Sequence, residues 1–148
     1  MLFRSKHINT IYSSDLSRAL ETAEIINEHY KAPVFRTVKL RPWSLGIYEG
    51  KPTKEVWDNL CKHIENPEEK VPEGESFNNF KRRCLTFVKQ VIQEAKDRDQ
   101  VILLTTHFRD VKLIQSWVAK GCPDDFSFDE KIMEKKDFEP GEVYVVPC

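Results

Sequence analysis

The hydrophobic residues of this chain recur at two spacings, one typical of helices and the other typical of strands. The helical spacing predicts helices over residues 15–30, 54–63, 77–97 and 111–119. Short apolar or alternating runs predict strands over residues 8–12, 34–38, 101–105 and 143–146. Segments with Pro and Gly separate these elements and are expected to be irregular loops.

The strand expected at 101–105 decides the fold class. Its residues, Val-Ile-Leu-Leu-Thr, form a continuous apolar run, which is typical of a strand buried on both faces of a parallel sheet. Strands and helices also alternate along the chain. We therefore expect an α/β fold, a three-layer sandwich with a mostly parallel sheet flanked by helices. A chain of 148 residues is long enough to form one domain with a core, over 1–148.

Charge and composition exclude several kinds of function. A net charge of −1 without a basic excess argues against nucleic-acid binding. No apolar run reaches membrane-spanning length, and the first residues lack the apolar segment of a secretory signal. We therefore expect a cytoplasmic protein with no membrane partner. The cysteines are scattered rather than paired at zinc-ligand spacing, which favours reduced thiols and no bound metal: Cys61, Cys84, Cys122 and Cys148.

An arginine at the start of the first predicted helix is the first candidate binding residue. Ser14 and Asp15 are good candidates for the N-cap of that helix, and Arg18 then lies in its first turn. A cation there does not help the helix dipole, but a cation and a helix N-terminus together suit a bound anion. The same pattern also fits a solvated surface arginine, which is the commoner case.

A histidine at a strand end is the second candidate. His107 follows the apolar run 101–105 and opens the next helix. Ligands of open α/β sheets bind at the carboxyl ends of strands, where Arg18 is also expected. The two residues together would make a pocket for an anion, and phosphate fits best. A structural histidine with no ligand is the alternative.

Four segments, in the same order along the chain, resemble blocks of the histidine phosphatase superfamily, which has the phosphoglycerate-mutase-like fold. Residues 11–23 are similar to its serine-aspartate-arginine-threonine block, and residues 40–50 to its loop that ends in Gly-x-x-Glu-Gly. Residues 72–76 are similar to its Pro-x-Gly-Glu-Ser turn, and residues 101–107 to the strand before its second active-site histidine. The resemblance runs through nearly the whole chain.

The resemblance implies a mechanism. In the family a histidine attacks phosphorus to give a phosphohistidine, while two arginines and a second histidine hold the phosphoryl oxygens. By position, Arg18 is one of these arginines and His107 is the second histidine. Ser14 and Thr106 are expected to assist in binding the phosphate. The implied ligand is a small phosphorylated substrate or phosphate itself, and no metal or cofactor is needed because side chains supply the positive charge.

The largest departure from the family is at the nucleophile. The family places it in an Arg-His-Gly motif on a strand well before the serine-aspartate block, and this sequence contains no Arg-His-Gly. His7 is a poor substitute, because no apolar strand precedes it and no Gly follows it. We therefore expect an incomplete, N-terminally truncated domain that lacks the first central strand of the family's sheet.

Two smaller departures concern the proton donor and the residue after His107. Pro42 stands where the mutases carry a glutamate that donates a proton. Glu75 and Glu49 are the possible replacements, although Glu75 also fits a helix-start carboxylate. The missing glutamate favours a phosphohydrolase over a mutase. The family usually has Gly after the histidine, whereas this chain continues with Phe108 and Arg109. Arg109 is either solvated or an added contact for the anion, and we expect it to be solvated.

Two functions remain open on the sequence alone. The first is a phosphatase domain that acts on a small phosphomonoester in its full-length relatives and is inactive alone without the nucleophile. The second is a non-catalytic phosphate-binding pseudophosphatase or interaction module that keeps the anion pocket.

Overall fold

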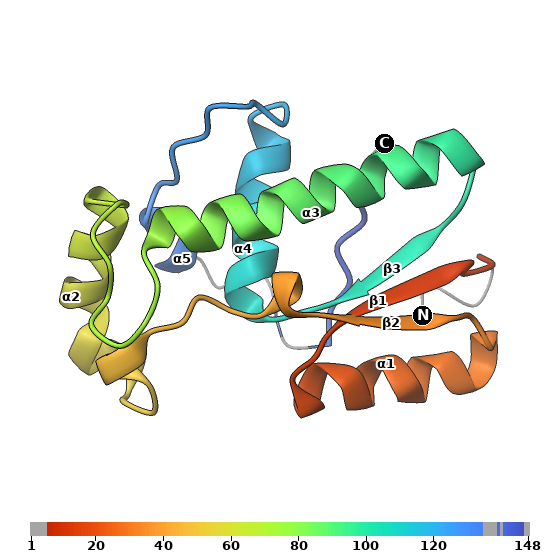
Figure 1. Cartoon of the computed structure of the whole chain (residues 1–148), viewed down its shortest axis with the longest axis horizontal. Helices are drawn as coiled ribbons and strands as arrows, with labels where there is room; N and C mark the ends of the chain where they lie inside the picture. The colour runs from red at the N-terminus through yellow and green to blue at the C-terminus, as the bar shows by residue number, and fades with distance from the viewer. Residues whose placement is uncertain (1–5, 135–138, 140, 147–148) are drawn as a thin grey trace. The chain divides into compact units, whose positions relative to one another are not determined.

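The structure is a computed structural model that describes residues 6–134, 139 and 141–146 (Figure 1). The chain divides into two compact units. Unit 1 contains residues 1–41, 84–107 and 148, and unit 2 contains residues 42–83 and 108–147. Helix α3 (Phe77–Arg98) begins in unit 2 and continues in unit 1. That the chain is one domain over 1–148 stays a prediction.

Unit 1 is built on a parallel sheet. Its strands are β1 (Thr10–Ser14), β2 (Val34–Thr37) and β3 (Ile102–Thr105), in the order β2-β1-β3. Both pairings are parallel, and Tyr12 of β1 lies between Phe35 of β2 and Leu104 of β3. All three strands therefore end at the same edge of the sheet, and the predicted parallel sheet is confirmed.

Helices cover both faces of this sheet, as Figure 1 shows for α1 (Ser17–Tyr30) and the later turns of α3. On the α1 side, Ile11 and Ala23 are fully buried in one apolar cluster. On the α3 side, the Tyr12 ring meets the edge of the Phe87 ring at 5.4 Å between centroids. Tyr12 also donates a hydrogen bond from its hydroxyl to Glu94 at 3.0 Å. The predicted three-layer sandwich is confirmed.

The start of α1 differs from the prediction. Its N-cap is Leu16, which makes no side-chain capping bond, and the helix begins at Ser17. Ser14 belongs instead to β1, because it pairs with Thr37 of the neighbouring strand. The prediction that Ser14 or Asp15 caps the helix is therefore wrong.

Two strand predictions also need correction. Ile102, Leu103 and Leu104 are only partly buried, because among the described residues β3 pairs with β1 alone and so lies at a sheet edge. The apolar residues 143–146 form no strand. They lie near the chain's end with no ladder partner among the residues described here, and an extended segment needs a partner to become a strand.

Unit 2 contains α2 (Thr53–Glu65), α4 (Phe108–Ala119), a short helix α5 (Lys131–Glu134) and the first turns of α3. Its aromatic core includes Trp43, whose ring lies 5.1 Å from the Phe77 ring and 6.5 Å from the Phe80 ring between centroids. The long apolar stripe that predicted α3 thus supplies its first part to this core.

Two glycines let two loops of unit 2 cross closely. Gly46 lies in η2 (Gly46–Tyr48), a single 3-10 turn, with φ of +49°. A Cβ at Gly46 would clash with the Pro72 carbonyl oxygen, and one at Gly74 would clash with the Ser44 carbonyl oxygen. Only glycine fits at either position.

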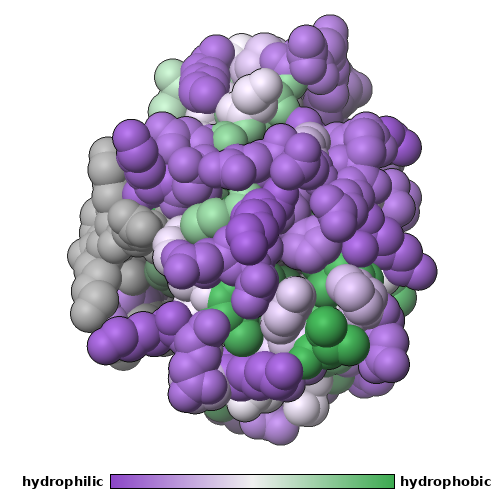
Figure 2. Space-filling model, turned by 90° about the vertical axis from the view of Figure 1, so that its left-hand side faces the viewer, coloured by the Kyte–Doolittle hydropathy of each residue, from purple (hydrophilic) through white to green (hydrophobic). Residues whose placement is uncertain are grey.

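The loop between β2 and η2 contains another 3-10 turn, η1 (Val38–Leu40), which belongs to unit 1. On the face that Figure 2 shows, hydrophilic residues dominate and hydrophobic residues form small separate groups. None of the described helices is both long and apolar enough to cross a membrane. Among the described residues, Cys61, Cys84 and Cys122 form no disulfide, and Cys148 lies outside the described residues.

Candidate active site

Three predicted residues meet at the carboxyl edge of the unit 1 sheet. Ser14 ends β1, Arg18 lies in the first turn of α1, and His107 comes two residues after β3. Arg18 Nε donates a hydrogen bond to His107 Nδ1 at 3.2 Å, and His107 Nε2 lies 2.9 Å from Ser14 Oγ. The parallel sheet brings together side chains that are 89 and 93 residues apart in sequence.

These contacts fix the proton on the imidazole ring. Nδ1 accepts from a guanidinium, so the hydrogen of the neutral ring is on Nε2 and points to Ser14 Oγ. Burial, reinforced by the charge of Arg18, lowers the pKa of His107 from 6.5 to about 4, while Asp15 opposes the shift. His107 is therefore neutral at pH 7.

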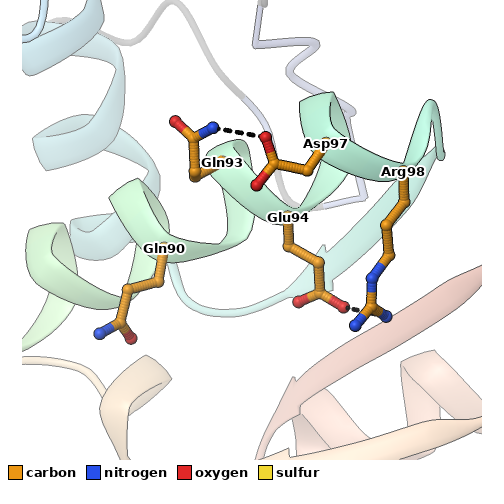
Figure 3. A pocket seen from close by; sticks show the side chains of 5 residues that line it. All are labelled: Gln90, Gln93, Glu94, Asp97 and Arg98. Carbon is orange, nitrogen blue, oxygen red and sulfur yellow. Dashed lines mark hydrogen bonds and ion pairs between the residues drawn. The ribbon is translucent and has the colours of Figure 1, made fainter.

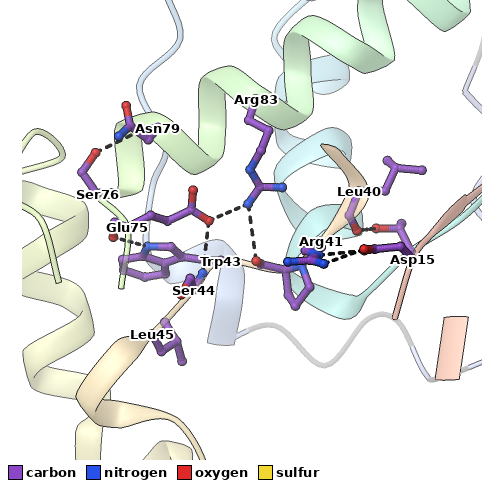
Figure 4. A network of polar contacts seen from close by, with 12 residues as sticks. Asp15, Leu40, Arg41, Trp43, Ser44, Leu45, Glu75, Ser76, Asn79 and Arg83 are labelled. Atoms are coloured by element: carbon purple, nitrogen blue, oxygen red, sulfur yellow. Dashed lines mark hydrogen bonds and ion pairs between the residues drawn. The ribbon is translucent and has the colours of Figure 1, made fainter. Parts of the chain in front are cut away.

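A carboxylate next to this group is already paired. Asp15 Oδ1 accepts from Arg41 Nε at 2.7 Å, and Asp15 Oδ2 accepts from Arg41 Nη2 at 2.5 Å (Figure 4). This two-point bond lowers the pKa of the Asp15 carboxyl group. The sequence did not predict the pair, because nothing in the local pattern links two residues 26 positions apart.

Thr106 has a structural contact of its own. Its hydroxyl donates to the Leu40 carbonyl oxygen at 2.9 Å, which ties the end of β3 to η1. The hydroxyl thus holds the loop that carries Arg41. An assisting role of Thr106 toward phosphate stays a prediction.

The candidate acid Glu75 belongs to a network within unit 2 (Figure 4). Its Oε1 accepts from Arg83 Nη2 at 2.5 Å and from the Ser44 backbone N–H at 3.2 Å. Its backbone carbonyl accepts from Trp43 Nε1 at 3.0 Å. Arg83 also donates to the Pro42 carbonyl oxygen at 3.4 Å, so it contacts both Glu75 and the loop at Pro42.

Arg83 is the residue of this network that the sequence analysis missed. It lies eight residues after Glu75, on the helix that starts just beyond it. No local signal links them, because the spacing of eight residues is longer than that of the side-chain pairs that meet on one helix.

The second candidate acid, Glu49, is exposed and accepts a hydrogen bond from the Leu45 backbone N–H at 2.8 Å. Arg109, which we expected to be solvated, is partly buried. Burial lowers the pKa of its guanidinium, and the negative charges of Glu49 and Asp110 oppose that effect. The expectation for Arg109 is therefore wrong, because acidic groups within unit 2 make its partial burial possible.

His7 is exposed and precedes β1, at the amino end of the strand. The five residues of β1 cover roughly 13 Å at about 3.3 Å per residue. His7 is therefore far from the carboxyl edge where Arg18 and His107 meet, which agrees with its rejection as the nucleophile.

An open depression lies elsewhere in unit 1, along the last turns of α3 (Figure 3). Its five lining residues all come from one helix: Gln90, Gln93, Glu94, Asp97 and Arg98. Gln93 donates to Asp97 at 2.7 Å and Arg98 to Glu94 at 3.1 Å, so these polar groups satisfy one another. Within the part of the chain that the structure describes, no three His, Cys, Asp or Glu residues are grouped to hold a metal.

Comparison with known proteins adds independent information. Residues 1–131 match the histidine phosphatase superfamily (branch 1). The chain is 27% identical over 119 residues to the broad-specificity phosphatase YOR283W of Saccharomyces cerevisiae, a match that covers 78% of this chain and 51% of that protein. The chain spans about half the length of the curated relatives that it matches.

Solved structures show the same fold. YhfR of Bacillus stearothermophilus has a TM-score of 0.64 at 27% identity, covering 82% of this chain and 61% of that one. Phosphoglycerate mutase from Bacillus anthracis has a TM-score of 0.65 at 22% identity, covering 78% of this chain and 61% of that one. The second similarity is one of fold alone.

Proposed function

The chain belongs to the histidine phosphatase superfamily (branch 1), and we propose that Arg18 and His107 bind the phosphoryl group of a small phosphomonoester. One observation carries the proposal, namely the hydrogen-bonded group of Arg18, His107 and Ser14 at the carboxyl edge of a parallel sheet. Ligands of open α/β sheets bind at this edge.

The surroundings of Arg18 support an anion as the ligand. The side chain is exposed, and the first turn of α1 contains no acidic residue and has no side-chain cap. Within the described part of the chain, Nε is the only nitrogen of this guanidinium with a hydrogen-bond partner. The two terminal nitrogens and the uncapped backbone N–H groups can therefore donate to phosphoryl oxygens.

We propose further that this chain alone binds phosphate without turning it over. None of its 148 residues belongs to an Arg-His-Gly motif, and His7 lies at the opposite end of β1. In the longer relatives, a phosphohistidine formed on that motif would use Arg18 and His107 to stabilise the charge that develops on the phosphoryl oxygens. Neither a metal nor a cofactor enters this mechanism.

Two glutamates of unit 2, Glu75 and Glu49, are the candidates for a proton donor. Glu75 accepts hydrogen bonds from Arg83 and from the Ser44 backbone N–H, and these contacts favour an anchoring role. Glu49 is exposed and accepts one backbone hydrogen bond, which leaves its second oxygen available. Pro42 in place of the mutase glutamate favours a hydrolytic reaction over a mutase reaction, and Glu49 stays a candidate acid.

A pseudophosphatase that only binds anions is the second candidate function. The missing nucleophile motif and Pro42 in place of the mutase glutamate both favour it. The two functions share the anion site and differ in whether any chain that contains this sequence forms a phosphohistidine.

Calorimetric titration of the whole chain with inorganic phosphate tests the site. Arg18→Ala removes charge-assisted hydrogen bonds worth about 1.5–3 kcal/mol, so we expect binding about 10 to 150 times weaker. Arg98→Ala is the matched control, because Arg98 is an exposed arginine at the far end of α3. Phosphate affinity that is the same in the chain and in Arg18→Ala would overturn the proposal.

Turnover of an aryl phosphate such as p-nitrophenyl phosphate tests the second part. We expect the chain to show no more turnover than His107→Ala. Turnover that survives His7→Ala and disappears in His107→Ala would contradict the proposal that this chain is inactive alone. Phosphate binding without turnover would support it.

A further inference from the structure

The hydrogen bonds of His107 point to a property of the site beyond binding. We propose that a tetrahedral dianion binds here together with one proton, taken up from solvent at Nδ1 of His107, while Ser14 acts as a positioning residue that holds Nε2. The inference rests on the proposed anion site and adds how that site responds to its ligand.

Before a ligand arrives, Nδ1 of the His107 ring is a hydrogen-bond acceptor. Arg18 Nε donates to Nδ1, so this nitrogen carries a lone pair and no proton. The ring's hydrogen is on Nε2 and points to the Ser14 hydroxyl at 2.9 Å. A ring in this state has no hydrogen left to donate to an oxyanion.

The position of Ser14 in β1 holds its hydroxyl in place. Its side chain is fully buried at the last position of β1, where the backbone pairs with Thr37 of β2. Ser14 Oγ also receives a longer contact from the Leu16 backbone N–H at 3.4 Å. The hydroxyl is thus a fixed acceptor, and it favours the ring tautomer with hydrogen on Nε2 over the one with hydrogen on Nδ1.

A bound anion changes the hydrogen-bond partners of Arg18 and of His107 Nδ1. A hydrogen bond from a guanidinium to an oxyanion is about twice as strong as one to a neutral acceptor. The Arg18 guanidinium is therefore expected to leave Nδ1 and donate to the anion. Nδ1 then loses its donor and faces a negative charge, and both changes favour a proton on it. The protonated ring donates from Nδ1 to the anion and still donates from Nε2 to Ser14.

The charges around His107 are consistent with this uptake of a proton on anion binding. Two charged groups act on the ring, Arg18 from α1 and Asp15 from the segment before α1. Asp15 is held by Arg41, so its charge stays in place. A bound dianion would offset the charge of Arg18, which together with burial keeps the empty site unprotonated.

Sulfate is a suitable probe because it stays a dianion throughout the pH range from 5 to 8. Calorimetric titration of the whole chain at pH 5.5, in two buffers with different heats of ionisation, gives the number of protons taken up. We expect close to one proton per sulfate and an affinity about ten times higher at pH 5 than at pH 6. Sulfate binding with no proton uptake would overturn the inference while leaving the anion site intact.

Two variants separate His107 from the other histidines. His107→Asn keeps a polar side chain without a titrating ring, so we expect its sulfate affinity to be independent of pH. His29→Gln is the control, since His29 is an exposed residue near the carboxyl end of α1, and its proton uptake should equal that of the unchanged chain. Uptake that persists in His107→Asn would assign the proton to another group and overturn the inference.

The role of Ser14 has a readout that needs no ligand. The 15N chemical shifts of the His107 ring report which nitrogen carries the hydrogen. We expect hydrogen on Nε2 in the unchanged chain and a mixture of both tautomers in Ser14→Ala. Hydrogen on Nδ1 in the unchanged chain would refute the positioning role, whether or not Ser14→Ala folds. If sulfate does not bind at all, the proposed anion site itself fails.

Discussion

Lowering the pH from 7 to 4.5 should destabilise unit 1 through His107. The ring binds a proton near pH 4 in the folded protein and near pH 6.5 in the unfolded chain. Between these values the unfolded state binds more protons, so the free energy of unfolding falls as the pH falls. The full difference corresponds to about 3.4 kcal/mol at about 1.4 kcal/mol per pKa unit, and solvent around the partly buried ring reduces it to about 2 kcal/mol.

Amide hydrogen exchange of β1 at pH 7 and pH 4.5 measures this loss where it occurs. Tryptophan fluorescence has no probe within the sheet, because Trp43, Trp57 and Trp117 all belong to unit 2. The same measurement on His107→Asn should show a smaller loss, by about 2 kcal/mol, because asparagine has no proton to take up.

Asp15 and His29 are the two groups from which the effect of His107 must be distinguished. Asp15, whose pKa is held below its ordinary value of 3.8, loses its stabilising effect only at lower pH and so lies outside the window. His29→Gln should behave like the unchanged chain, because His29 is exposed. If His107→Asn and the unchanged chain lose the same free energy between pH 7 and 4.5, the account of His107 as a neutral, partly buried ring is wrong.

Three further outcomes follow from contacts described above. Arg18→Ala should raise the pKa of His107 above 4 but leave it below 6.5, because burial, the larger cause, remains; an NMR titration of the ring checks this. Asp15→Asn should lower the same pKa further, and an unchanged titration would show that Asp15 is too well screened to matter. Ser76→Ala should cost about 1 kcal/mol in urea unfolding, because the Ser76 hydroxyl caps α3 by accepting from the Asn79 backbone N–H at 3.2 Å; no loss would mean that the cap is replaced by water.

Helices with a long apolar stripe were predicted well. The pattern over 77–97 gave α3 to within one residue, because eight of its positions recur at helical spacing and bury the same side. The ends of β1 were not predictable in this way. Ser13 and Ser14 are polar and look like a turn, yet they belong to the strand because their backbones pair with Arg36 and Thr37.

The candidate site was also predictable only in part. Arg18 and His107 were found from their places at a helix start and a strand end, since all parallel strands deliver their carboxyl ends to one edge. The hydrogen bonds that these residues make were not predictable. The contact between His107 and Ser14 depends on the register of β1 against β3, and the Asp15–Arg41 pair depends on where η1 leads the chain.

The crossing of Gly46 and Gly74 has a mechanical consequence for unit 2. The two loops are joined by hydrogen bonds from Ile47 N–H to the Pro72 carbonyl at 3.0 Å and from Glu75 N–H to the Ser44 carbonyl at 3.1 Å. Because Gly46 and Gly74 have no side chains, the two backbones are in direct contact at the crossing. Neither loop can therefore move without moving the other. Glu49 and Glu75 therefore belong to one rigid unit of two joined loops. A substitution at Gly46 or Gly74 that disrupts the crossing would displace both carboxylates together.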